Sequence, residues 1–322
     1  MLAKSSQKSA INKPLLWGVS LVISLGLLAL VIMQVDVGQA ASMFQNISSV
    51  LLGVAFVFLV MEGIATALRL WLFAGKRPCM SEALKANAWY VLLLVILPAR
   101  LGEVAAVVVL ERYLGQKYGA AAMSIIMQRL YDMIVLGTIF LIALLGLGDF
   151  VDKTFMSIAS LALIGFVLFV LVRLEFFLTI AAVIFKKAPK KLYRLILQAR
   201  LYSRHGFKIR DIPLALLFTF IKWVSNLAAL VFLFMSLHLG LGMFENITVA
   251  AAYNFLAIIP LQTIGGIGIG EAGLALLFTG TGLDVSTAAS ASLMIRFVIL
   301  IFPFIFWVMV MGGLNLKKRL SI

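Results

Sequence analysis

Charge is scarce in this sequence, and metal-binding side chains are scarcer. Only 12% of its 322 residues are charged, against 63% that are hydrophobic. Cys79 is the single cysteine, and the two histidines, His205 and His238, lie far apart. One cysteine excludes an internal disulfide, and none of these residues has the spacing of a metal site. We therefore predict neither a bound metal nor a cofactor.

Long polar stretches are missing as well, and their absence fixes the class of protein. The mean hydropathy is +1.12, and no connection between apolar runs is long enough to form a separate soluble domain. This composition predicts a single all-α polytopic membrane domain over residues 1–322. The net charge of +14 does not indicate nucleic acid, because the basic residues gather in short connections between apolar runs.

Apolar runs of about 20 residues are the length that crosses a bilayer, and six of them predict full crossings. They lie near 15–33, 49–74, 119–146, 154–174, 213–238 and 286–314. The first run is longer than the apolar region of a signal peptide, about 7–15 residues. A retained helix is therefore favoured over a signal peptide cleaved near Ala40.

Two further apolar stretches, 84–112 and 248–280, are interrupted near their middles by helix-breaking residues. These are Pro98 and Gly102 in the first, and Pro260, Gly265, Gly266, Gly268 and Gly270 in the second. Each half is too short to cross a membrane alone, so we predict two re-entrant helical hairpins. A pair of thin, tilted crossings is the alternative for each stretch.

The distribution of basic residues predicts the topology. Most of them fall on the side shared by both termini and the segment 175–211, which makes that side cytoplasmic. The segment itself is predicted to lie on the anionic membrane surface, with a solvated linker as the alternative.

The order of crossings and hairpins predicts two similar units. Residues 14–150 form one unit, and residues 151–174 together with 212–315 form the other. Each unit has three crossings and one hairpin, and an odd number of crossings inverts the second unit. An inverted 3+3 repeat with broken helices is typical of transporters.

Both interrupted stretches contain a glutamate just after the break, and an arginine follows inside a later apolar run. Arg129 comes 26 residues after Glu103, and Arg296 comes 25 residues after Glu271. Ionisable groups in hydrocarbon are costly and usually line a polar cavity. The predicted substrate-binding residues are Arg100, Glu103, Arg129, Asp132, Glu271 and Arg296, with Glu62 and Lys222 as further deep candidates.

Depth along the spans refines this prediction. Asp132 lies three residues after Arg129 on the same helical face, so the two can pair, and Glu103 and Glu271 lie at the hairpin breaks, where they can meet the arginines. Arg69 and Arg173 lie nearer the ends of their spans, where a long side chain can reach the interface, and we leave them out.

Two interpretations of the deep charges remain open. They can be permanent ion pairs that brace helices, or they can line a cavity that binds a phosphate group. Arginine binds phosphate through paired hydrogen bonds, and a half-helix N-terminus adds backbone donors. The tract Gly268–Gly273 formally matches G-x-G-x-x-G, but no strand precedes it, so a nucleotide site is not predicted.

Taken together, these motifs resemble the transmembrane, flippase-like domain of lysylphosphatidylglycerol synthetases. P-x-R-x-G-E occupies Pro98–Glu103, R-x-x-D occupies Arg129–Asp132, and a second glycine-rich tract ends at Glu271. The resemblance covers about 14–315. It implies a stand-alone member, without the soluble transferase domain, in the cytoplasmic membrane of a bacterium or archaeon.

This resemblance also implies a function. The protein would move a lipid, or a lipid-linked group, between leaflets, with membrane lipids that carry a phosphate headgroup as its partners. Ala106 and Gly270 depart from the family pattern, because each lacks the positive charge that often stands there.

We therefore predict a lipid translocator that is not an enzyme. An integral membrane transferase acting on a lipid is the first alternative, and a small-solute secondary transporter or an accessory subunit is the second. A transferase needs a nucleophile with a base, or a metal cluster, at the membrane surface, and the sequence shows neither.

Overall fold

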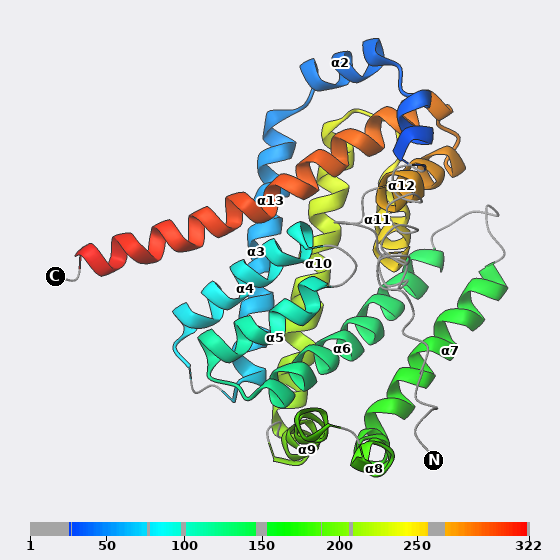
Figure 1. Ribbon diagram of the computed structural model, residues 1–322. Helices are drawn as coiled ribbons and strands as arrows, with labels where there is room; N and C mark the ends of the chain where they lie inside the picture. The colour runs from blue at the N-terminus through cyan, green and yellow to red at the C-terminus, as the bar shows by residue number, and fades with distance from the viewer. Residues whose placement is uncertain are drawn as a thin grey trace, which may run out of the picture.

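The computed structural model in Figure 1 describes residues 26, 28–75, 78–97, 101–145, 153–187, 189–205, 209–256 and 268–320. Over these residues the secondary structure is helical and contains no strand. The main helices are α2 (Val37–Gln45), α3 (Ser49–Phe73), α4 (Met80–Ile96), α5 (Leu101–Leu114), α6 (Tyr118–Leu145), α7 (Lys153–Val172), α8 (Leu174–Ile184), α9 (Lys190–His205), α10 (Ile212–Ser236), α11 (Met243–Leu256), α12 (Ile269–Gly280) and α13 (Val285–Leu320). The predicted all-α polytopic class is confirmed.

Four of these helices are long and apolar enough to cross a membrane: α3, α6, α10 and the Val285–Leu314 part of α13. Helices α7 and α8 meet at an angle of 66° and would add a fifth span if they formed one. Helix α7 covers the stretch near 154–174 where a crossing was predicted, and it counts as a span only together with α8, which turns away after Arg173. The crossing predicted at 15–33 lies mostly outside the described residues, and its described part is helical.

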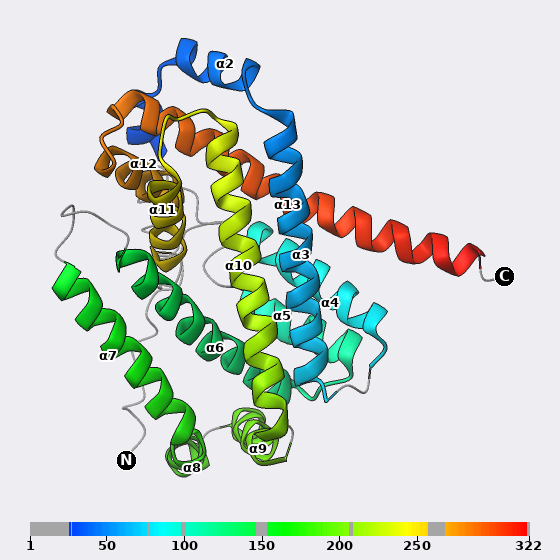
Figure 2. The same cartoon turned by 180° about the vertical axis from the view of Figure 1, so that it is seen from behind.

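Helices α3 and α10 form the centre of the molecule. They lie side by side and run in opposite directions in both views (Figures 1 and 2). Each has 25 residues and is therefore about 37 Å long at 1.5 Å per residue. The backbone N–H of Ser48 donates to the carbonyl of Ser236 at 3.0 Å, which joins one end of the pair.

The two interrupted stretches form helical pairs, α4 with α5 and α11 with α12. The two helices of each pair pack against each other, and the two pairs lie toward opposite ends of α3 (Figure 1). A Cβ atom on Gly102 would lie 2.7 Å from the Leu93 carbonyl oxygen, so a glycine is needed where α5 begins against α4. Helix α4 begins four residues before the predicted start at 84 and has 17 residues. The turns themselves, including Pro98, Arg100, Pro260, Gly265 and Gly266, lie outside the described residues.

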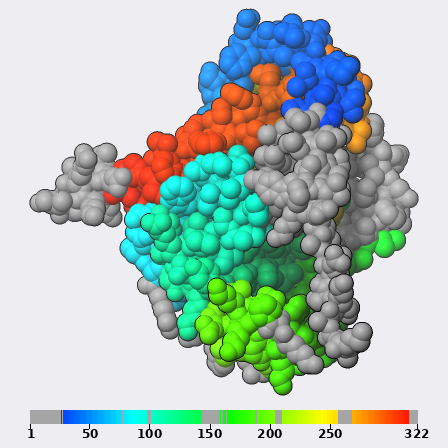
Figure 3. All heavy atoms as spheres, viewed as in Figure 1, coloured from blue at the N-terminus to red at the C-terminus, as the bar shows by residue number. Residues whose placement is uncertain are grey.

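Helices α8 and α9 lie across one end of the bundle, where both are seen end-on in Figures 1 and 2. They make up most of the basic segment predicted at 175–211. Helix α9 reaches the surface directly below α5 and α6 (Figure 3). The Tyr202 hydroxyl donates to the Phe73 carbonyl at 2.5 Å, so α9 covers the end of α3. Burial raises the pKa of Tyr202 to about 12.

Candidate functional site

The first hairpin and the helix that follows it bring three polar side chains together. Arg129 of α6 donates to Glu103 of α5 at 2.9 Å and to the hydroxyl of Tyr90 of α4 at 3.4 Å. The Arg129 side chain is 39% exposed and the Glu103 side chain 23% exposed. This ion pair is therefore accessible from outside the helix bundle.

The second hairpin builds a matching group. Arg296 of α13 lies 3.4 Å from Glu271 of α12, measured from Nε to Oε1, and donates to the hydroxyl of Tyr253 of α11 at 3.1 Å. The other oxygen of Glu271 accepts from the backbone N–H of Gly268 at 2.7 Å. The two charged side chains are 12% and 3% exposed. The second pair is therefore closed where the first is open.

The two groups occupy equal positions in their helices. The tyrosine is the eleventh residue of the first hairpin helix in both cases, counted from Met80 and from Met243. The glutamate is the third residue of the second hairpin helix, and the arginine is the twelfth residue of the following helix. Both glutamates thus lie in a first helical turn, where the helix dipole favours negative charge.

Gly270 is explained by the arginine beside it. A Cβ atom at this position would lie 3.2 Å from the Cζ atom of Arg296. The guanidinium therefore packs directly against the backbone of the first turn of α12. This close approach gives a structural reason for glycine at one of the two positions that depart from the family pattern.

A third group of charges is buried between α3, α6 and α10. Asp132 accepts from Arg69 at 2.5 Å, from Trp223 at 2.9 Å and from Lys222 at 3.3 Å. The hydroxyl of Thr219 accepts from Arg69 at 3.3 Å, and all five residues are buried. The Lys222 ammonium also lies 3.5 Å from the ring centre of Trp223, a cation–π contact. We call these five residues the Asp132 cluster.

The Asp132 cluster corrects two predictions. The pair that spacing allowed between Asp132 and Arg129 is not the one formed: Arg129 pairs with Glu103, as the sequence also allowed, and Asp132 pairs with Arg69 and Lys222. The placement of Arg69 at the interface is also wrong, since Arg69 is only 2% exposed. The contacts join three central helices, which is the bracing arrangement that the sequence left open.

Glu62 belongs to a separate polar chain next to this cluster. Its carboxylate accepts from the amide of Asn226 at 3.0 Å, and the carbonyl of Asn226 accepts from Asn254 at 2.7 Å. The chain runs from α3 through α10 to α11, and so connects a central helix to the second hairpin.

The described residues contain no group of three or more His, Cys, Asp or Glu side chains that could hold a metal ion. Two tyrosines, Tyr90 and Tyr253, were missed by the sequence analysis. Aligning the two interrupted stretches on their helix starts, and asking which polar residues recur, is the signal that would have found them.

Comparison with known protein families identifies the chain. The sequence profile of the lysylphosphatidylglycerol synthase transmembrane region matches residues 17–306. The chain belongs to this family. No curated protein and no solved structure matched in the corresponding comparisons. Family membership makes this a multi-pass membrane protein related to lipid modification or flipping.

Proposed function

We propose that this protein is a lipid translocator, not an enzyme, which moves an anionic lipid between the leaflets of a bacterial or archaeal cytoplasmic membrane. The observation that carries the proposal is the pair of matching Tyr–Glu–Arg groups, one in each half of the chain. Their equal helix positions support an inverted repeat, since α3 and α10, the helices that precede the two hairpins, run in opposite directions. Transporters built from inverted repeats bind substrate at broken helices near the bilayer midplane.

The arginines are suited to the phosphate of a lipid headgroup. A guanidinium offers several donors in a fixed plane and binds phosphate or carboxylate in the same manner. In each group the arginine is paired with a glutamate. A headgroup would displace the glutamate, and the tyrosine hydroxyl would remain as a neutral neighbour.

The difference in exposure between the two groups supports alternating access. Arg129 is accessible while Arg296 is covered, as expected for a protein with one gate open and the other closed. In the opposite conformation the second group would open and the first would close. That both groups face one shared cavity stays a prediction.

Lipid movement in reconstituted liposomes tests the proposal. A fluorescent phosphatidylglycerol and a fluorescent phosphatidylcholine would be followed by chemical quenching of the label in the outer leaflet. Arg129→Gln or Arg296→Gln should slow movement of the anionic lipid about 10- to 100-fold, because a hydrogen bond to a charged group is worth about 1.5–3 kcal/mol. Arg173→Gln is the matched control, since Arg173 is an exposed arginine at the junction of α7 and α8.

The outcomes are distinct. Normal lipid movement by folded Arg129→Gln and Arg296→Gln variants would leave only a bracing role for both pairs. Transport of a soluble anion, without lipid movement, would favour a small-solute carrier instead.

A further inference from the structure

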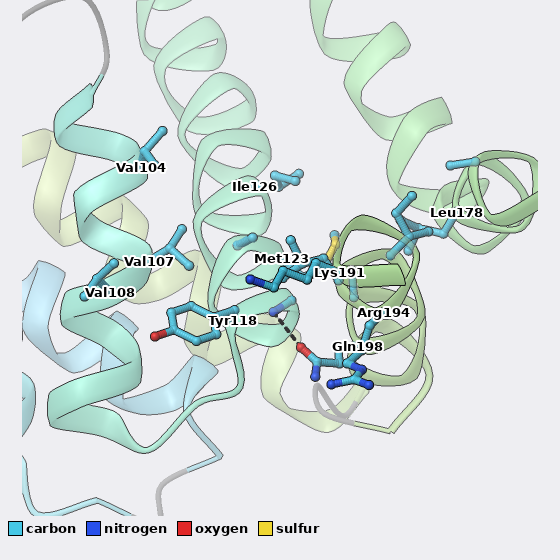
Figure 4. Close-up of a pocket in the computed structure, with 16 residues that line it drawn as sticks. Val104, Val107, Val108, Tyr118, Met123, Ile126, Leu178, Lys191, Arg194 and Gln198 are labelled. Atoms are coloured by element: carbon cyan, nitrogen blue, oxygen red, sulfur yellow. Dashed lines mark hydrogen bonds between the residues drawn. The ribbon is translucent and has the colours of Figure 1, made fainter. Parts of the chain in front are cut away.

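A groove lined by α5, α6, α8 and α9 lies at the basic end of the molecule. It has a volume of about 660 Å³, within the range of about 300–1,000 Å³ typical of ligand sites. Figure 4 shows the side chains that line it. The lining residues that matter here are Val104, Val108, Ile126, Ala181, Lys191 and Arg194.

The wall of the groove on α5 and α6 is apolar and open to the side. Val104 and Val108 of α5 are 63% and 51% exposed, and Ile126 of α6 is 47% exposed. Lining residues on α6 run from Tyr118 to Ile126, which is about 12 Å along the helix. Exposed aliphatic side chains along a lateral groove of this length suit part of an acyl chain.

One wall of the groove is cationic. Lys191 and Arg194 of α9 line it and are both exposed. In the part of the chain that the structure describes, no ion pair uses either side chain. In Figure 4 both extend from α9, with Arg194 beside Gln198 and Lys191 between Gln198 and Ile126. The groove therefore joins a cationic wall on α9 to an aliphatic wall on α5 and α6, as a phospholipid joins a charged headgroup to acyl chains.

The groove is preformed, because α9 is fixed against α6. The backbone N–H of Gly119 donates to the side chain of Gln198 at 3.0 Å. A Cβ atom on Gly119 would collide with the Leu195 carbonyl oxygen, so the two helices touch backbone to backbone at this point. When the helices of a binding site are already in place, little free energy is lost to ordering them as the ligand binds. More of the favourable free energy of contact then contributes to affinity.

The aliphatic wall of the groove adjoins the first Tyr–Glu–Arg group. Val104 directly follows Glu103 in α5, and Ile126 lies three residues before Arg129 in α6. Residues three apart share a helical face. A lipid in the groove would thus extend from the cationic wall toward the open ion pair.

The geometry points to a binding site for one anionic glycerophospholipid, with its phosphate on Lys191 and Arg194 and one acyl chain between α5, α6 and α8. This site is distinct from the Arg–Glu pairs, and the inference does not require that the lipid cross the membrane. If the proposed function holds, the groove is the place where a lipid waits before it reaches Arg129.

Titration of the purified protein with phosphatidylglycerol or phosphatidylcholine, followed by native mass spectrometry, tests the site. The wild type should bind one phosphatidylglycerol in preference to phosphatidylcholine. The double variant Lys191→Gln/Arg194→Gln should bind it about 30-fold more weakly, the equivalent of about 1 kcal/mol for each charge. Lys186→Gln/Lys190→Gln is the matched control, because both lysines are exposed in the same segment but do not line the groove. Equal loss in the control, or unchanged binding in Lys191→Gln/Arg194→Gln, would overturn the inference, as would equal affinity for the two lipids.

A second pair of variants tests the apolar part. Ala181→Trp fills the groove from α8, whereas Val183→Trp places the same ring on an exposed position of the same helix. Only Ala181→Trp should lose bound phosphatidylglycerol, and retention of the lipid by that variant would refute the site. A protein that binds lipid here but moves none in liposomes would refute the proposed function and leave this site standing.

Discussion

The two Arg–Glu pairs should differ sharply in their effect on stability, although we expect both to be needed for transport. Replacing Arg296 with glutamine leaves the carboxylate of Glu271 only 3% exposed and without its countercharge. Breaking a buried ion pair by removing one partner costs about 3–5 kcal/mol. The equivalent change at Arg129 leaves Glu103 23% exposed. In the water-filled cavity that the proposed function requires, loss of a solvent-accessible pair costs about 0–1 kcal/mol.

Reversible unfolding in mixed detergent micelles, followed by tryptophan fluorescence, measures this difference. We expect Arg296→Gln to lose at least about 2 kcal/mol more free energy of unfolding than Arg129→Gln, the difference between the lower buried value and the upper exposed value. The double variant Glu271→Gln/Arg296→Gln removes both charges, and should recover part of the loss because no buried charge is left unpaired.

Two results would refute this reasoning. Equal destabilisation by Arg129→Gln and Arg296→Gln would show that exposure does not decide the cost. A double variant less stable than Arg296→Gln alone would show that Glu271 is stabilised by the Gly268 backbone without the arginine.

Three further predictions concern other parts of the molecule. Asp132→Leu should destabilise by about 3–5 kcal/mol in the same unfolding assay, because it leaves the two buried cations of its cluster unpaired; a loss below about 1 kcal/mol would contradict the bracing role. Hydrogen bonds involving Ser81 lower the pKa of the exposed Cys79 thiol. The pH at which maleimide labelling of Cys79 reaches half its maximal rate should therefore lie below about 8.5, the ordinary thiol pKa, and Ser81→Ala should move this midpoint to higher pH. Gly102→Val should separate α5 from the backbone of α4 near Leu94 and increase amide exchange in that hairpin, whereas unchanged exchange would argue against the close contact.

Some contacts of the site could be predicted from sequence because their signals are local. A helix break, a glutamate in the next turn and an arginine about 25 residues later occur twice, and the structure joins each glutamate to its arginine. The role of these residues in binding substrate stays a prediction. Their tyrosine partners show only as a recurrence between the two stretches once their helix starts are aligned, since a single tyrosine in an apolar helix is common.

The partner of Asp132 could not be predicted in the same way. Spacing along one helix suggested Arg129, but the strongest contact comes from Arg69, 63 residues earlier on another helix. Arg69 lies four residues before the end of α3, and distance from a span end is the usual guide to depth. That guide fails here because α9 folds over the end of α3 and Tyr202 is bonded to Phe73.

The Asp132 cluster also constrains how the protein is made. Arg69 leaves the ribosome 63 residues before Asp132, and Lys222 follows 90 residues after Asp132. At a synthesis rate of about 5–20 residues per second, Asp132 is made roughly 3–13 seconds after Arg69, and Arg69 lacks this counterion until then. An arginine at the centre of a lone membrane helix is disfavoured by about 2.5–3.5 kcal/mol on insertion scales, and Arg69, four residues before the end of α3, would carry part of that cost. Helix α3 is therefore expected to stay beside the insertion machinery until α6 has been synthesised, so that the two helices enter the lipid together.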